Sequence, residues 1–168
     1  MNAATRPIKR DQHIVRLSRE HHTGLLFGWK IRQGLKNSTA PERIVQYARY
    51  FWQQHLLPHF REEEEILFVP IPSDPQVARA KQEHKGLKQL IEGLDTHSAA
   101  APLAKQLQQL ADELDRHIRF EERELFPHLE KALTADQLES IGRQLDAIPA
   151  PEEEDRFEDA FWKVKSSL

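Results

Sequence analysis

A histidine, a glutamate four residues later and a Leu-Phe pair four residues after that occur together twice in this chain. The first copy, HFREEEEILFVP, runs from His59 to Pro70, and the second, HIRFEERELFPH, runs from His117 to His128. Residues four apart lie one turn apart on the same face of an α-helix. The repeat therefore predicts two helices, each of which presents a histidine and a carboxylate to one common surface.

Apolar residues recur with a helical period along the whole chain, and the alternation typical of β-strands is absent. Short connections separate the long helical segments, which favours an all-α, up-down-up-down four-helix bundle with additional C-terminal helices. We expect the four long helices at about residues 12–36, 41–68, 75–97 and 102–131, followed by a shorter helix at about 134–147. A last amphipathic helix is predicted to carry Phe157, Phe161 and Trp162.

Several residues mark where these helices begin. Thr39 and Thr134 are each followed three residues later by Glu or Gln, the signature of a capping box, and Asp74 precedes a proline at the start of a helical pattern. Pro58 lies inside the second predicted helix and removes a backbone hydrogen bond, so it should kink this helix just before His59.

The length of 168 residues is that of about one domain. We divide it into a tail at 1–11, a four-helix bundle at 12–131 and a helical C-terminal extension at 132–168 that packs on the bundle. The start, MNAATRPIKRDQH, lacks the apolar core of a signal peptide. No apolar run approaches the length of a membrane span, so we expect a cytoplasmic protein without a membrane partner.

Polar side chains interrupt the apolar stripe of each long helix. The stripe consists of positions three and four apart that face the core. A buried unpaired carboxylate costs on the order of several kcal/mol or becomes protonated, so such side chains need a common partner, and a metal ion provides one. The candidate ligands on the stripes are His21, His59, Glu63, His84, His117 and Glu121.

The first helix offers two adjacent histidines. The stripe through His21 has the same spacing as the stripe through His84, whereas the stripe through His22 meets Ser or Arg before it and Arg32 after it. Against this, HTGL from His22 matches HKGL from His84. We predict His21 as the metal ligand and keep His22 as the alternative.

Other polar residues have simpler interpretations. Glu62, Glu64 and Glu65 are expected to form a solvated face, and His55 is expected at the solvent edge or behind a ligand. A core histidine that is hydrogen-bonded to its neighbours is the alternative interpretation for His21 and for His84.

Composition limits the chemistry. The chain has no cysteine, which excludes disulfides, thiolate metal sites and cysteine nucleophiles. The formal net charge of −3 provides no basic patch of the kind that nucleic acid requires, so we expect no nucleic-acid partner. Imidazole and carboxylate ligands without sulfur suit iron, manganese or zinc. Nothing in the sequence identifies a protein partner.

These motifs resemble the hemerythrin-like (HHE cation-binding) domain family. The signature H-x-x-x-E-E-x-x-L-F begins at His59 and again at His117, and QEHKGL around His84 resembles the histidine-bearing helices of hemerythrins. The likeness covers roughly residues 11–131. It implies a non-haem di-iron centre inside a four-helix bundle, with the glutamates bridging and the histidines terminal.

Oxygen-carrying members of this family have a fifth histidine one turn after the histidine of the third helix, where this chain has Lys88. The resemblance therefore implies a protein that binds, senses or reduces oxygen, peroxide or nitric oxide, or handles iron, rather than a reversible oxygen carrier. No catalytic acid–base pair is visible beyond the ligands, so any turnover would be redox chemistry at the metals. The alternative is a non-catalytic bundle in which a structural metal ion supports an interaction module.

Overall fold

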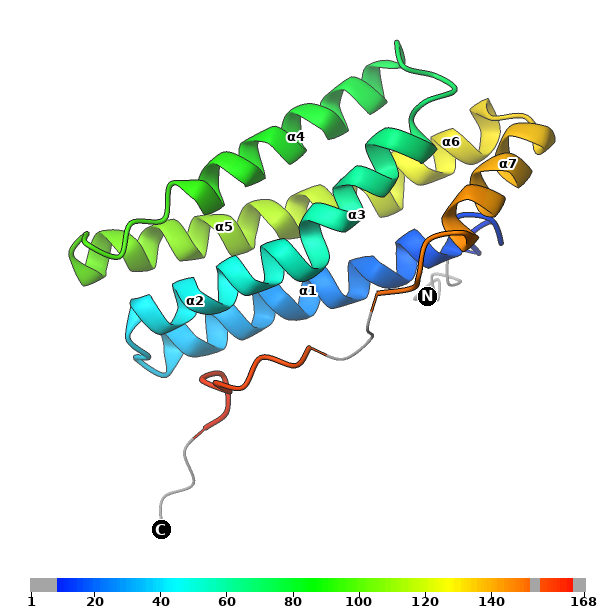
Figure 1. Ribbon diagram of the computed structural model, residues 1–168. Coiled ribbons are helices and arrows are strands. Elements are labelled where there is room, and N and C mark those ends of the chain that lie inside the picture. The colour runs from blue at the N-terminus through cyan, green and yellow to red at the C-terminus, as the bar shows by residue number, and fades with distance from the viewer. Residues whose placement is uncertain (1–8, 152–154, 165–168) are drawn as a thin grey trace, which may run out of the picture.

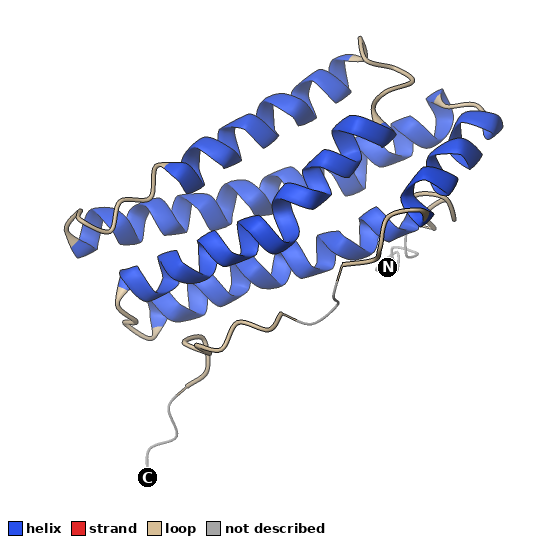
Figure 2. Cartoon of the chain, in the orientation of Figure 1, coloured by secondary structure: helices blue, strands red, loops and turns tan. Residues whose placement is uncertain are grey.

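The computed structural model describes residues 9–151 and 155–164, and its regular secondary structure there is entirely helical (Figure 2). Four long rods form the up-down-up-down bundle that the sequence predicts. They are α1 (Val15–Lys36), α2 (Pro41–Phe51) continuing into α3 (Leu57–Glu62), α4 (Pro75–Glu92), and α5 (Ala100–Phe120) continuing into α6 (Phe126–Ala132). A shorter helix, α7 (Ala135–Asp146), follows.

The rods run side by side, with α1 and α4 both packed along α5 (Figure 1). Helix α7 turns back beside the N-terminal end of α1, where its Gly142 lies against His13. A Cβ atom on Gly142 would lie 2.6 Å from His13 Nδ1, so a larger residue would push α7 away. None of the described helices combines the length and the apolar character that crossing a membrane requires.

Three π-helical turns belong to the second and fourth rods: two join α-helices within a rod, and one ends the second rod. They are η1 (Trp52–Leu56), η2 (Glu63–Leu67) and η3 (Glu121–Leu125). In η2 the Phe68 N–H donates to the Glu63 carbonyl oxygen five residues back, at 2.8 Å. Two of the three turns therefore begin at the glutamates of the repeated motif, and π-turns within α-helices are frequent at functional sites.

The π-turns also change which residues face the core. A π-turn holds more residues than an α-turn, so the apolar stripe shifts along the chain after it. Leu67 is fully buried, whereas Ile66, which the α-helical spacing places on the stripe, is only partly buried. At the predicted kink, η1 ends just before Pro58, and the Leu57 N–H bonds to the Trp52 carbonyl.

The core consists of two apolar clusters that flank a polar layer. One contains Phe27 and Ile31, which follow His21 in α1, together with Leu107. The other contains Leu17, which precedes His21, together with Phe126. Apolar residues are thus buried at both ends of the bundle, and the histidines and glutamates lie between them.

Two of the predicted helix starts are confirmed. The Asp74 side chain accepts hydrogen bonds from two backbone N–H groups at the start of α4, and Thr134 forms a reciprocal capping box with Gln137. The box at Thr39 is wrong, because α2 begins after Ala40 without a side-chain cap. The Thr39 hydroxyl instead donates to the Phe161 carbonyl oxygen at 3.5 Å, where the C-terminal segment docks.

The predicted last amphipathic helix is also wrong for the described residues 155–164, which form an irregular segment with a turn. The rings of Phe157, Phe161 and Trp162 nevertheless surround Tyr47, with ring centroids 5.2 to 5.5 Å away. Phe161 fits against Gly34, where a Cβ atom would lie 2.6 Å from its ring. An irregular backbone allows all three rings to reach one site, which the single face of a short helix does not.

Ion pairs fix this segment to the first two rods. Asp155 pairs with Lys30 at 2.8 Å and accepts a hydrogen bond from the Tyr47 hydroxyl, and Asp159 pairs with Arg43 at 2.6 Å. These tertiary contacts replace the helical hydrogen bonds that the sequence pattern predicts.

Candidate metal centre

Six buried polar side chains from all four rods meet between the two apolar clusters. Each is between 0 and 6% exposed. They are His21 from α1, His59 from α3, Glu63 from η2, His84 from α4, His117 from α5 and Glu121 from η3. The structure thus brings together the six residues on the sequence stripes.

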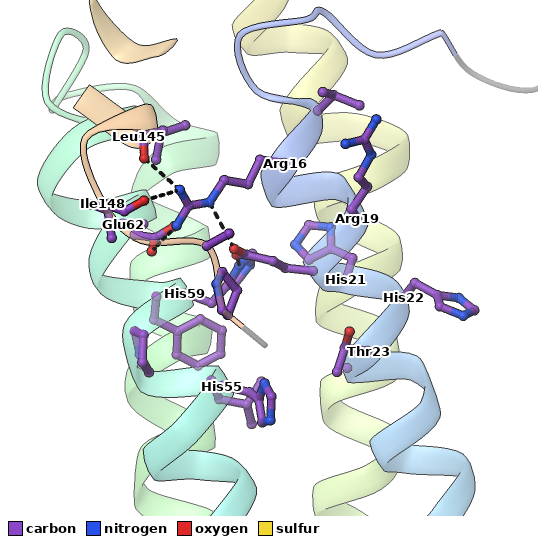
Figure 3. A pocket seen from close by; sticks show the side chains of 18 of the residues that line it. Arg16, Arg19, His21, His22, Thr23, His55, His59, Glu62, Leu145 and Ile148 are labelled. Carbon is purple, nitrogen blue, oxygen red and sulfur yellow. Dashed lines mark hydrogen bonds and ion pairs between the residues drawn. The ribbon is translucent and has the colours of Figure 1, made fainter. Parts of the chain in front are cut away.

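The neighbouring His22 is not part of this cluster. It is exposed and points away from His59, whereas His21 lies on the same side of α1 as the cluster (Figure 3). Successive residues on a helix are rotated by about 100°, so two adjacent histidines cannot face one buried centre. The assignment of His21 as the ligand stays a prediction, and the structure gives His22 no position from which to replace it.

The six side chains form two overlapping groups. One contains His21 and His59, the other contains His84 and His117, and both glutamates belong to each group. Within a group, the candidate ligand atoms all lie within 4.8 Å of one another.

Each glutamate divides its two oxygens between the groups. Glu63 Oε1 lies 2.9 Å from His59 Nε2, and Glu63 Oε2 lies 3.0 Å from His84 Nε2. Glu121 Oε2 lies 2.9 Å from His21 Nε2, and Glu121 Oε1 lies 3.2 Å from His117 Nε2. The geometry therefore offers two cation positions, one at each histidine pair. Each position has one oxygen of Glu63 and one oxygen of Glu121 beside it.

The facing atoms fit metal ligands better than hydrogen-bond partners. All four histidine Nε2 atoms and all four oxygens of Glu63 and Glu121 are buried without a hydrogen bond, in spite of their short separations. Leaving so many buried polar atoms unsatisfied would be costly. Two ligands at about 2.1 Å from one ion and at right angles are about 3 Å apart, which matches the observed spacing.

A second layer of carboxylates lies behind the histidines. The Nδ1 atoms of His21, His59 and His84 lie 2.6, 2.6 and 2.8 Å from carboxylate oxygens. The partners are Glu122 for His21, Glu20 for His59 and Glu64 for His84, and Glu83 lies 3.6 Å from His117 Nδ1. The three partners at hydrogen-bond distance hold Nδ1 protonated and leave Nε2 free for a metal.

These outer carboxylates were not predicted from the sequence, although each is adjacent in sequence to a residue of the cluster. Glu20 and Glu83 each precede a cluster histidine, and Glu64 and Glu122 each follow a cluster glutamate. Each one lies beside a cluster histidine on a different rod, so its role depends on packing. The arrangement repeats between the halves of the bundle: the carboxylate before a cluster histidine lies beside the next cluster histidine, and the carboxylate after a cluster glutamate bonds to a histidine in the other half.

The expectation of a solvated face at Glu62, Glu64 and Glu65 is wrong for Glu62. Glu62 is only 7% exposed and pairs with Arg16 at 3.0 Å, whereas Glu64 bonds to His84 and keeps 40% of its side chain exposed. Glu65 is exposed, as expected. The π-turn and the packing of α1 and α7 cover residues that an isolated helix would leave in water.

Opposite charges in the cluster raise the pKa values of its histidines and lower those of its glutamates. Burial alone would lower the pKa of His59, but the negative charge of Glu63 and the hydrogen bond to Glu20 raise it from 6.5 to about 9. The pKa values of the other three cluster histidines are raised in the same way. Burial would raise the pKa of Glu121, whereas the histidines, His117 foremost, hold it well below its usual range. Without a cation, the cluster therefore keeps protons on imidazole.

A groove of about 1240 Å³ leads to the cluster (Figure 3), and its lining includes His21, His59 and His117. Apolar residues, Leu56, Phe60, Leu114 and Ile118, line part of it. Other residues in its lining are polar, among them Arg19, His22 and His55. His55 thus lies in the groove and outside the six-residue cluster.

A four-helix bundle with a buried layer of four histidines and two glutamates defines a class of metal-binding helical proteins. Residues 13–129 match the family described as Hemerythrin HHE cation binding domain. The chain belongs to this family, which confirms the resemblance seen in the sequence. Family membership and the buried cluster together indicate a metal cation-binding protein.

The chain is also similar to a protein named DNA nickase from Nostoc sp. (strain PCC 7120 / SAG 25.82 / UTEX 2576). The two are 28% identical over 145 residues, which cover 83% of this chain and 40% of the relative. The chain thus spans less than half of the length of that protein. No solved structure matches the chain significantly.

Proposed function

We propose that this is a non-haem di-iron protein that binds, senses or reduces a small oxidant such as oxygen, peroxide or nitric oxide, or that handles iron. The observation that carries the proposal is the division of the oxygens of Glu63 and Glu121 between two histidine pairs. When bound, iron would supply one-electron redox chemistry and coordination positions for a small ligand. We include a cytoplasmic location in the proposal, with which the absence of cysteine is compatible.

The ligand types support iron over copper or calcium. Four neutral imidazoles and two carboxylates suit iron, with manganese and zinc as alternatives, whereas calcium prefers oxygen ligands alone. Four imidazoles and two bridging carboxylates provide about eight bonds, against about twelve for two octahedral ions. Positions would therefore stay available for a small ligand.

The surroundings of the cluster support a small ligand over a large one. The Phe60 ring stacks on His84 with centroids 3.9 Å apart, and Phe126 lies 5.2 Å from His21. Aromatic rings thus cover histidines of both pairs, which favours a small ligand at the cluster itself. Lys88, at the position of a fifth histidine, is exposed and lies 3.8 Å from Glu92, so it adds no ligand. This supports chemistry other than reversible oxygen carriage.

A second candidate is a structural metal site in a non-catalytic interaction module. Leu26 and Trp29 on α1 are 42% and 48% exposed, large apolar side chains that a partner could cover. Under this alternative the bound metal would stabilise the bundle without changing its oxidation state.

The name of the Nostoc relative raises DNA cleavage as a further possibility to test. The net charge of −3 supports our proposal that this chain does not bind nucleic acid. Metal-loaded protein should leave a supercoiled plasmid intact. Nicking by the protein loaded with iron or manganese, abolished in Glu63→Gln, would contradict this part of the proposal.

The main test combines metal analysis with optical spectra. Protein expressed with ample iron should contain about two metal ions per chain and absorb in the near ultraviolet in air. Reduced protein exposed to air should become ferric without a long-lived oxygenated form. An adduct that releases oxygen under vacuum through repeated cycles would restore the carrier interpretation, and bound zinc with no redox response would favour the structural metal.

A further inference from the structure

We propose that the two cation positions are unequal: the position of His21 and His59 fills first and holds its ion tightly, and the position of His84 and His117 fills second and exchanges its ion. This inference rests on the proposed two-cation site. It is carried by the different support that the two halves of the bundle give to corresponding histidines.

The outer partner of His21 is itself firmly held. Glu122 Oε1 lies 2.6 Å from His21 Nδ1 and also accepts a hydrogen bond from the Ser18 hydroxyl at 2.7 Å. Arg10, whose side chain is 4% exposed, donates to the other oxygen of Glu122 and to its backbone carbonyl. Arg10 also pairs with Glu130 at 3.0 Å, which fixes the arginine.

The outer partner of His59 is held as well. Glu20 Oε2 lies 2.6 Å from His59 Nδ1, and Glu20 Oε1 lies 3.3 Å from Arg16 Nε. Arg16 in turn donates to the carbonyl oxygens of Leu145 and Ile148, at 2.6 and 2.8 Å, and pairs with Glu62 (Figure 3). The end of α7 therefore fixes the arginine that fixes the carboxylate behind His59.

The corresponding contacts in the other half are looser. Glu83 Oε2 lies 3.6 Å from His117 Nδ1, beyond hydrogen-bond distance, and both atoms are buried without a hydrogen bond. Arg79 occupies the place that Arg16 has in the first half, four residues before the outer glutamate, but its side chain is 52% exposed. It lies over the Phe120 ring at 3.7 Å instead of being held by a helix end.

His84 has an outer partner at 2.8 Å, but that partner, Glu64, is 40% exposed. The corresponding exposures are lower for Glu20, at 15%, and for Glu122, at 28%. A more exposed carboxylate without an anchoring arginine holds a histidine less firmly, because solvent screens its charge. A small cavity of about 310 Å³ also lies beside Glu83 and His117. This cavity leaves room for water near the second position, just as the groove does near the first.

Anchored outer carboxylates strengthen metal binding because they hold the imidazole in its binding orientation and increase its basicity, and losing one typically lowers affinity by about 10-fold to 100-fold. At the first position both histidines have an outer carboxylate that an arginine anchors. At the second position neither outer carboxylate is held as firmly. The difference in support thus predicts stepwise binding.

The test is a titration of the metal-free protein with Mn(II), followed by calorimetry and electron paramagnetic resonance, and repeated with Fe(II) without air. We expect two steps that differ by about 10-fold or more in affinity. The first equivalent should give the signal of an isolated ion, and a coupled-pair signal should appear only with the second. A coupled pair at low occupancy, or a single step of two ions, would overturn the inference. Absence of any binding would refute the proposed site itself.

Glu20→Gln and Glu83→Gln form a matched pair for assigning the steps. Glu20→Gln should weaken the tighter step by about 10-fold or more, and Glu83→Gln should change either step by less than this. Equal effects would show that the two positions have equivalent support. Circular dichroism checks that the variants fold. If Glu20→Gln does not fold, Glu122→Gln and Glu64→Gln form the replacement pair, because they remove the outer carboxylates of His21 and His84.

Discussion

Glu63 and Glu121 lie side by side at the centre of the bundle, and both are completely buried. The charge of Glu121 acts to raise the pKa of Glu63, yet the surrounding histidines outweigh burial and this repulsion and hold that pKa below its usual range. Two adjacent buried carboxylates that stay ionised require positive charge between them. Protons on the histidines supply it in the metal-free state, and cations replace those protons on binding.

Removing one bridging carboxylate should empty the site. Glu63→Gln keeps the size of the side chain but removes a charge from the proposed ligand of both cation positions, so we expect metal content to fall from about two ions per chain to below one. Elemental analysis of purified protein measures this. Glu65→Gln, an exposed change two residues away, is the control and should retain the metal. A full metal complement in Glu63→Gln would refute the bridging role.

The adjacent histidines provide a second matched pair. His21→Ala should lower the metal content and the melting temperature of the metal-loaded protein, because it removes a proposed ligand that is 4% exposed. His22→Ala changes an exposed side chain and should leave both unchanged. Metal analysis and thermal unfolding with and without added iron give the answer. The reverse pattern would show that α1 binds metal through its other face.

Metal affinity should rise with pH. The pKa of His59 is raised from 6.5 to about 9 in the metal-free fold, so around neutral pH an incoming cation must displace a proton. Affinity for Mn(II) should therefore increase between pH 6.5 and pH 9. Calorimetry in buffers with different ionisation enthalpies should detect proton release, and a pH-independent affinity without proton release would contradict the prediction.

The metal-free protein should show the opposite trend in stability. A group whose pKa is raised in the fold adds stability that is fully present below its ordinary pKa and is lost as pH rises through the folded value. For His59 this loss falls between pH 6.5 and about 9. Urea unfolding of metal-free protein across this range should show a falling free energy of unfolding, and His59→Gln should reduce the dependence.

The C-terminal segment should stabilise the bundle through Phe161. This side chain is 4% exposed against Gly34, so Phe161→Ala should lower the free energy of unfolding by about 3 kcal/mol. Val164→Ala, at a position that is 80% exposed, is the control and should have little effect. Chemical denaturation measures both variants. Equal stability of Phe161→Ala and the unchanged protein would mean that the segment does not hold its place on α1 and α2.

Much of the fold and the composition of the cluster follow from the sequence, because they depend on local spacing. The four-residue interval from His59 to Glu63 places both side chains on one face of a helix wherever that helix packs. Helical periodicity likewise predicts the rods, and the choice of His21 over His22 follows from which face of α1 is apolar.

Contacts between rods were decided only by the tertiary structure. Glu20 lies beside His59, and Glu62 beside Arg16, because separate helices pack together, and nothing in the local sequence distinguishes these glutamates from the exposed Glu65. The π-turn at Glu63 moved burial from Ile66 to Leu67 for the same reason: its hydrogen bonding departs from the α-helical period on which the sequence argument depends. Residues 155–164 have an amphipathic pattern but no helix, since burial of their aromatic rings around Tyr47 outweighs a local preference that is weak in so short a segment.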